Sequence, residues 1–134
     1  MARKLLLVAA LAFSMSAQAR HGAVTLVDPP PLPVPHGTAD ADVEKAIISS
    51  GVHRNWKVVE RKPGAVVLEY APRDFSVRVR VTHDAKSVSI TYADSNNLEY
   101  GQEDGHAVIH PNYNRWVNNL AHDIEGELTL GTVK

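Results

Sequence analysis

The sequence contains no cysteine among its 134 residues. This absence excludes disulfides, thiolate metal sites and a cysteine nucleophile, so the core alone must stabilise a folded domain. A basic excess is also absent, because 14 Lys and Arg stand against 15 Asp and Glu. Dedicated nucleic-acid-binding proteins usually have a large basic excess. We therefore expect no nucleic-acid partner.

Long hydrophobic runs are absent too, since none reaches the ~20 residues needed to cross ~30 Å of hydrocarbon. The longest, residues 5–13, follows Arg3 and Lys4 and precedes Ala17-Gln18-Ala19. These are the three parts of a secretory signal peptide. We expect residues 1–19 to be cleaved after Ala19, which leaves a periplasmic or secreted protein with no transmembrane segment. Its 12 basic and 15 acidic residues would give a net charge of −3.

Prolines dominate the start of the mature chain, with five between Asp28 and His36. Each removes a backbone donor and favours an extended polyproline II conformation. This composition predicts a linker over residues 20–38, ahead of a domain over residues 39–128 and a flexible tail over residues 129–134.

Two periodicities divide the domain. Helical spacing of Val43, Ala46 and Ile47 predicts a first helix over residues 40–50, with Gly51 as its stop. From Trp56 the period becomes two, with a turn at Pro63-Gly64 between the first two strands. Strict alternation over residues 74–82 and 87–93 predicts two more strands, paired as a hairpin.

A second amphipathic helix follows near Pro111, and its stripe of apolar side chains consists of Tyr113, Trp116, Val117, Leu120, Ile124 and Leu128. The predicted fold class is α+β in the order α-β-β-β-β-α. It is a four-stranded antiparallel meander with the N-terminal and the C-terminal helix packed on one face.

Sixteen residues, Asp94 to Ile109, separate the last predicted strand from the second helix. A connection of this length is usually functional or mobile. Alternatively, residues 98–100 and 107–109 pair as two short strands around a turn at Asp104-Gly105. The pattern leaves both alternatives open.

The segment from Tyr92 to Ile124 resembles a group of small exported proteins of Gram-negative bacteria. Their shared pattern is Tyr-x-Asp-Ser-x-Asn-Leu-x-Tyr, a spacer, and Ile-His-x-x-Tyr-Asn-x-Trp-x-x-Asn-Leu-x-x-Asp-Ile, which this chain matches from Tyr92 to Ile124. Members are often lipoproteins, whereas this chain has no cysteine to carry a lipid. No activity is assigned to the group, so the resemblance implies export and an α+β layout but no catalytic residue.

Polar and aromatic side chains concentrate in the same segment and form the predicted ligand-binding set: Asp94, Ser95, Asn97, Tyr100, His110, Tyr113, Asn114 and Trp116. Tyr92, Tyr100, Tyr113 and Trp116 could line a pocket for a sugar or another ring-bearing ligand, although aromatic residues at this spacing more often belong to a core. Arg78 and Arg80 could bind an anion on the open sheet face. A solvated charged face is the alternative for this pair.

Catalysis is the rival hypothesis, as an envelope hydrolase of metal-assisted or serine type that uses His110 with Asp94 or Ser95. No Gly-x-Ser-x-Gly elbow accompanies the serine. His106 and His110 are four apart, but Gly105 and Pro111 bracket a non-helical segment, so we predict neither a metal site nor a cofactor. The leading hypothesis is a non-catalytic binding or interaction module of the cell envelope, whose partner is an envelope protein or a small ligand.

Overall fold

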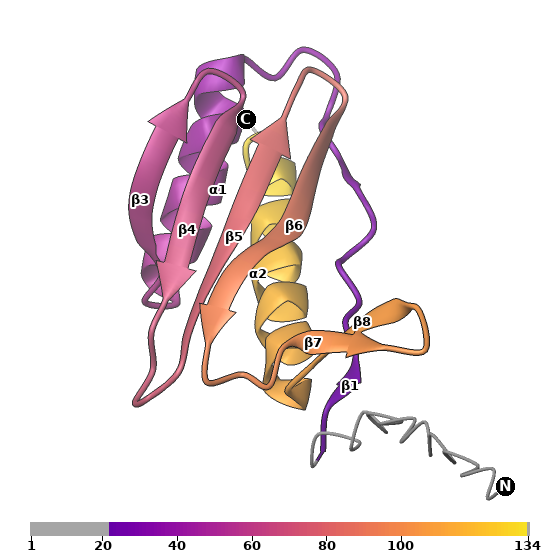
Figure 1. Cartoon of the computed structure of the whole chain (residues 1–134). Coiled ribbons are helices and arrows are strands. Elements are labelled where there is room, and N and C mark those ends of the chain that lie inside the picture. Colours follow the sequence, from indigo (N-terminus) through magenta and orange to yellow (C-terminus); the bar gives the residue numbers. More distant parts are fainter. Residues whose placement is uncertain (1–21, 134) are drawn as a thin grey trace, which may run out of the picture.

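The computed structural model describes residues 22–133, which form an α+β protein (Figure 1). Its helices are α1 (Asp40–His53) and α2 (Pro111–Leu130). Its strands are β1 (Val24–Thr25), β2 (Leu32–Pro33), β3 (Lys57–Lys62), β4 (Ala65–Tyr70), β5 (Ser76–His83), β6 (Ser87–Asn96), β7 (Gly101–Glu103) and β8 (His106–Ile109). The predicted signal peptide, residues 1–19, lies outside the described residues.

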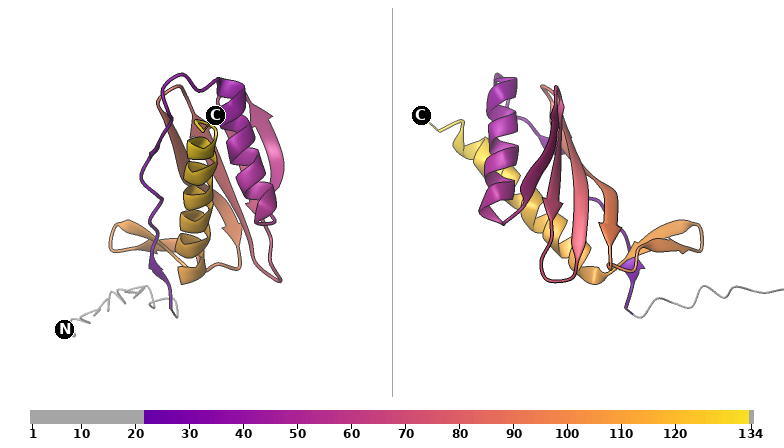
Figure 2. Two further views of the ribbon diagram at one scale, coloured as in Figure 1. Left: turned by 180° about the vertical axis from the view of Figure 1, so that it is seen from behind. Right: turned by 60° about the vertical axis from the view of Figure 1, so that its left-hand side comes forward.

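The predicted meander is present, because β3, β4, β5 and β6 pair in chain order and antiparallel. The sheet has a fifth strand, since β2 pairs with the free edge of β6 to give the order β2-β6-β5-β4-β3. A second sheet, β1-β8-β7, projects from one end of the molecule (Figure 2). The α+β class is confirmed, whereas a single four-stranded sheet is wrong. The proline-rich segment and the loop before α2 supply the additional strands.

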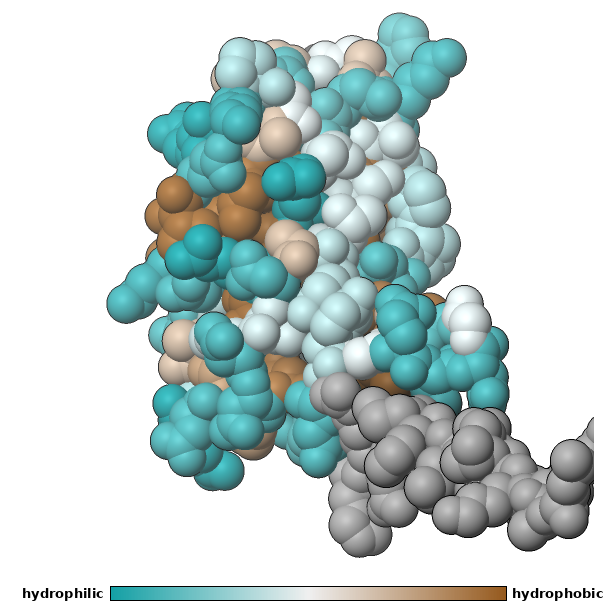
Figure 3. Space-filling view, in the orientation of Figure 1, coloured by the Kyte–Doolittle hydropathy of each residue, from teal (hydrophilic) through white to brown (hydrophobic). Residues whose placement is uncertain are grey.

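One face of the large sheet is buried and the other is open. On β5, Val77, Val79 and Val81 are completely buried while the residues between them are exposed. Both helices cover the buried face, as predicted (Figure 2). Leu120 is completely buried and Trp116 packs against the same core. Figure 3 looks onto the open face, which is mainly hydrophilic and has its largest hydrophobic area on the side of β3 and β4.

A bulge interrupts the alternation of β6. Val79 pairs with Tyr92, whereas Arg78 pairs with Asp94, so Ala93 is the extra residue. The bulge shifts the alternation by one position. Asp94 therefore lies exposed beside Arg78, and Ser95 is half-buried next to Tyr92.

The loop before α2 contains a hairpin, so the second alternative for residues 94–109 is right about two short paired strands and wrong about the position of the first. Its strands are β7 and β8, so the first lies at residues 101–103 and not at 98–100. Leu98 is instead buried in the core, with its carbonyl accepting the His110 N–H at 2.8 Å. Asn97 and Glu99 on either side have φ of 62° and 54°. A left-handed φ costs a non-glycine residue about 1 kcal/mol, so burial of Leu98 must stabilise this conformation.

The proline-rich segment is packed against the domain over residues 22–38, which we call the strap, and it does not form the free linker that its composition predicts. Leu32 and Val34 are buried in the core. The strap also donates backbone hydrogen bonds, from Leu26 to Ala107 and from Val34 to Lys86, both at 2.9 Å. Pro33 lies exposed between the two buried residues, on an edge strand where its missing donor costs nothing.

Helix α1 is three residues longer than predicted, because Gly51 does not end it. The helix closes at Asn55 (φ 68°) with bonds from Asn55 N–H to Val52 and from Trp56 N–H to Gly51. These bonds form a Schellman motif. A Cβ at position 51 would lie 3.0 Å from Leu68 Cδ1, so glycine allows the helix to approach β4. At the other end of the chain, α2 continues through Gly126 to Leu130, two residues beyond the prediction.

Candidate functional site

Most of the predicted ligand-binding residues hold the fold together. Tyr92 stacks on Tyr100 with ring centroids 4.3 Å apart, and Tyr113 meets Tyr92 edge to face at 5.6 Å. The Tyr113 hydroxyl donates to Asp28 at 2.7 Å, and burial raises the pKa of Tyr113 above its ordinary value. Tyr113 is therefore a core residue that binds the strap, which agrees with the core alternative for these aromatic side chains.

Asn114 fastens the strap by its side chain. Its Nδ2 donates to the Thr25 carbonyl at 2.9 Å, and its Oδ1 accepts the Val27 N–H at 3.0 Å. The carboxamide thus satisfies a backbone donor and a backbone acceptor in the way that a neighbouring strand would. Both hydrogen-bonding groups of the Asn114 side chain are used internally.

The polar residues after the bulge are also engaged. The Ser95 hydroxyl lies 2.7 Å from the Tyr92 hydroxyl, and Asn97 Nδ2 donates to the Asp74 carbonyl at 3.5 Å. His110 caps α2, because its Nδ1 accepts the Asn112 N–H at 3.0 Å. Within residues 22–133 no hydrogen bond joins His110 to Asp94 or Ser95. The geometry therefore contains no hydrogen-bonded triad of the kind that the hydrolase hypothesis requires.

The predicted anion pair lies on the open face of the sheet. Arg78 forms an ion pair with Glu69 at 2.8 Å, and the Asp94 carboxylate lies opposite. The hydrogen bond to Glu69 raises the pKa of Arg78, with a smaller contribution from Asp94. Glu60 lies within electrostatic range of the exposed Arg80. Glu60 is itself ion-paired with Lys62 at 2.9 Å. A carboxylate thus already compensates Arg78, which favours the solvated alternative for this residue.

A different group of side chains surrounds a hollow of about 330 Å³ between the end of α1 and the first half of α2. We call it the Trp116 pocket, and its lining consists of Arg54, Asn55, Trp56, Tyr70, Arg115, Trp116 and Asn119. A neighbouring hollow of about 250 Å³ shares Asn55 and Tyr70 and also includes Lys57. Together they reach the size of small-molecule sites, which span about 300–1,000 Å³.

Three aromatic rings form the wall of the Trp116 pocket. Trp56 is 3% exposed and meets Tyr70 at 5.3 Å with an interplanar angle of 32°. Tyr70 meets Trp116 edge to face at 5.0 Å. The Phe75 ring centroid lies 6.3 Å from that of Trp116. The rings contact one another at different angles, so packing between aromatic side chains positions this wall.

Local structure explains why these rings meet. The Schellman motif at the end of α1 turns the chain directly into Trp56, one residue before β3. Lys57 lies opposite Glu69 in the antiparallel β3–β4 ladder. Trp56, one residue before Lys57, therefore lies beside Tyr70, one residue after Glu69. Trp116 reaches the same place from α2, which crosses the buried face of the sheet.

The two arginines of the pocket differ in charge compensation. Arg54 donates two hydrogen bonds to the two carboxylate oxygens of Asp123. This hydrogen bonding holds the pKa of the Asp123 carboxyl below its usual range and raises the pKa of Arg54. Arg115 donates instead to the neutral Asn112 side chain at 2.9 Å, so no carboxylate of the described residues neutralises it.

The two asparagines of the pocket have free hydrogen-bonding groups. Neither the Asn55 nor the Asn119 carboxamide makes a hydrogen bond to residues 22–133, in contrast to Asn114. A carboxamide carries two donors and an acceptor. The pocket therefore offers two such groups and one guanidinium beside an aromatic wall.

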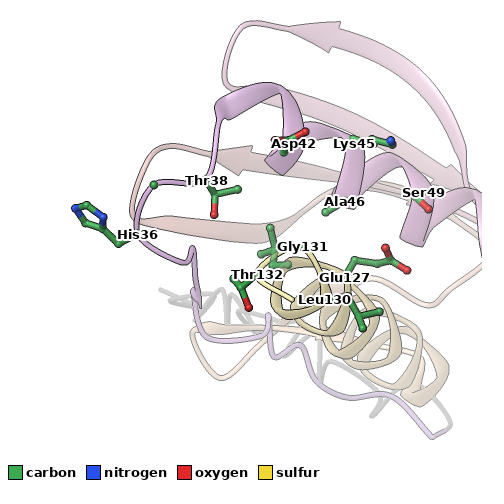
Figure 4. A pocket seen from close by; sticks show the side chains of 12 residues that line it. His36, Thr38, Asp42, Lys45, Ala46, Ser49, Glu127, Leu130, Gly131 and Thr132 are labelled. Atoms are coloured by element: carbon green, nitrogen blue, oxygen red, sulfur yellow. The ribbon is translucent and has the colours of Figure 1, made fainter. Parts of the chain in front are cut away.

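A larger hollow, of about 770 Å³, lies among the strap, α1 and the end of α2 (Figure 4). Its charged side chains have both signs, Lys45 with Asp42 and Glu127, and no Trp, Tyr or Phe lines it. His36 points away from it (Figure 4). Polar groups that converge beside aromatic side chains distinguish ligand sites, and the Trp116 pocket has both.

Sequence reasoning found one of the seven lining residues, Trp116. One signal points to others, because Arg115 and Asn119 are four apart on the helix beside Trp116. An unbroken hairpin from Lys62 and Ala65 would place Lys57 opposite Tyr70, and the bulge at Val59 brings Trp56 there instead. Arg54 and Asn55 have no such signal, because their position depends on where α1 ends.

The described residues contain no group of three or more His, Asp or Glu side chains able to hold a metal ion. None of the helices among residues 22–133 is long and apolar enough to cross a membrane. Comparison of the chain with protein-family models, with curated proteins and with solved structures gave no match.

Proposed function

We propose that the protein is an exported, non-catalytic binding module of the cell envelope and that the Trp116 pocket is its ligand site. The signal-peptide pattern of residues 1–19 and the resemblance to exported proteins support the location. The pocket supports binding. A pocket with a preformed apolar wall and a few convergent polar groups is the usual form of a small-molecule site.

One observation carries the proposal: two carboxamides and three aromatic rings in mutual contact line the same hollow, and neither carboxamide makes a hydrogen bond to residues 22–133. Asn114 on the same helix, by contrast, binds the strap backbone with its side chain. Asn55 and Asn119 are free to bind a ligand that combines a flat apolar face with hydroxyl or amide groups.

Tryptophan fluorescence tests this site directly, because the chain has two tryptophans and both line the pocket. Titration with a panel of monosaccharides, disaccharides and aromatic acids should identify compounds that change the emission. Asn55→Gly keeps the left-handed backbone while removing the carboxamide, and Asn119→Ala removes the second. Both variants should weaken the response at least about fivefold, since each removes a hydrogen bond of about 1 kcal/mol.

Asn118→Ala is the matched control, because Asn118 is exposed on α2 and makes no side-chain hydrogen bond within residues 22–133. Equal loss in Asn118→Ala and Asn119→Ala would contradict the location of the site. Export has its own test, the intact mass of the protein recovered from the periplasm of a bacterial host. We expect a chain that begins at Arg20, and recovery of the uncleaved precursor from the cytosol would contradict export.

A further inference from the structure

The charge of the Trp116 pocket indicates which ring-bearing compounds it accepts. Arg54 is occupied by Asp123 through two hydrogen bonds, so this pair contributes little net charge. Arg115 contributes a full positive charge, with a single hydrogen bond to a neutral amide. A guanidinium has five N–H donors, which leaves most of those on Arg115 available to a carboxylate.

The surroundings add to this positive potential. Lys57 lines the neighbouring hollow and forms no ion pair within residues 22–133. Glu69, the one carboxylate that lines this hollow, is paired with Arg78 at 2.8 Å. An anion in the Trp116 pocket would therefore meet Arg115, and one that extends into the neighbouring hollow would meet Lys57. Neither lining presents an uncompensated carboxylate.

The Asn55 and Asn119 carboxamides favour a sugar over an aromatic acid as the ligand. An aromatic carboxylate could stack on Tyr70 or Trp116 and pair with Arg115, but it would leave Asn55 and Asn119 without partners. The hydroxyl groups of a sugar can pair with both, because each hydroxyl donates and accepts. The apolar C–H face of a sugar ring suits the electron-rich face of an aromatic side chain.

We propose that the Trp116 pocket binds a carboxylate-bearing sugar, with Arg115 as the carboxylate anchor and the two asparagines as the hydroxyl partners. This inference rests on the proposed function, since it names the ligand class of the same site. The pocket and the neighbouring hollow share Asn55 and Tyr70, so a second sugar unit would extend past Tyr70 toward Lys57.

The test compares D-glucuronate with D-glucose and with benzoate by tryptophan fluorescence, with the mature chain at low salt. We expect glucuronate to bind at least about tenfold more tightly than either, because only glucuronate uses the charged and the neutral groups together. Raising the salt concentration from about 0.02 M to about 0.5 M should weaken the binding of glucuronate and leave the binding of glucose unchanged. The reason is that the Arg115 guanidinium is exposed, so salt screens its attraction to a carboxylate.

Arg115→Gln should reduce the affinity for glucuronate at least about tenfold, to the level of glucose. The affinity of Arg115→Lys for glucuronate should lie between those of the unaltered protein and of Arg115→Gln, because lysine keeps the charge but cannot bind a carboxylate in a bidentate way. Arg80→Gln is the control, since it makes the same charge change on the opposite face of the sheet. It should leave binding unchanged.

Three outcomes overturn the inference. If glucose and glucuronate bind with equal affinity and Arg115→Gln changes neither, the pocket does not select anionic ligands and is a site for neutral ones. Tighter binding of benzoate than of glucuronate removes the sugar class. If the fluorescence responds neither to these three compounds nor to the panel of monosaccharides, disaccharides and aromatic acids, the proposed function is overturned as well.

Discussion

Replacing Asn114 with alanine should release the strap from the domain. The side chain makes two hydrogen bonds to the strap backbone, to Thr25 at 2.9 Å and from Val27 at 3.0 Å. Each is worth about 1 kcal/mol net, so the strap should open about 2 kcal/mol more easily. The unfolding free energy in urea should fall by the same amount, because global unfolding also breaks both bonds.

Amide hydrogen exchange measures this opening at one residue. The Leu26 N–H donates to the Ala107 carbonyl, so its bond survives the substitution and its exchange reports opening of the strap. A change of about 2 kcal/mol corresponds to about thirtyfold faster exchange. The Gly131 N–H, which bonds to Glu127 at the far end of α2, exchanges by local fraying and should keep its rate.

Asn118→Ala is again the control, because it makes the same change of helix propensity on the exposed face of α2. The difference between the two variants isolates the contribution of the two bonds. Exchange at Leu26 that is equal in Asn114→Ala and Asn118→Ala would refute the account of the strap as a fastened part of the fold.

Three further substitutions test the packing and the charges. Leu120→Ala should lower the unfolding free energy by about 2–5 kcal/mol, because Leu120 is completely buried, and a loss under about 1 kcal/mol would contradict the core. Gly126→Ala should raise the unfolding free energy by up to about 1 kcal/mol, since nothing lies within 4 Å of the added Cβ, and destabilisation would show that α2 is not regular there. Asp123 has a lowered pKa when folded, so its contribution is present above the unfolded pKa and is lost as the pH falls through the folded pKa. Asp123→Asn should therefore cost no more than about 1 kcal/mol at pH 7 and should weaken the decline of stability below about pH 5, which urea unfolding at several pH values measures; an unchanged acid decline would contradict the pair.

The large sheet and its helices could be predicted because burial on one face imposes a period on the sequence. Alternation over β5 and the first half of β6 follows from the pleat, and the stripe from Tyr113 to Leu128 follows from the helical turn. The strap imposes no such visible period. Its two-residue alternation, Leu32 and Val34 around Pro33, is hidden among prolines, and its partners lie more than fifty residues away along the chain.

The candidate site shows a different limit of sequence reasoning. Concentration of polar and aromatic residues identified the segment from Asp94 to Trp116, but most of these side chains fasten the strap and the loop. The Trp116 pocket combines the end of α1, one residue of β4 and one face of α2. Such a site depends on how the helices are oriented across the sheet, and no local sequence pattern predicts this orientation. Whether an asparagine is used internally, as Asn114 is, or left free, as Asn55 and Asn119 are, also depends on tertiary contacts.

The central claim is that ligand binding occurs at the Trp116 pocket, and nuclear magnetic resonance of the ¹⁵N-labelled mature chain tests it most directly. Titration with D-glucuronate should shift the indole N–H signals of both Trp56 and Trp116 and the Arg115 side-chain signal. Amide signals of the strap and of β7 should remain unchanged. Shifts confined to β7, the strap or the open face around Arg78 and Arg80, with both indole signals unmoved, would contradict the account.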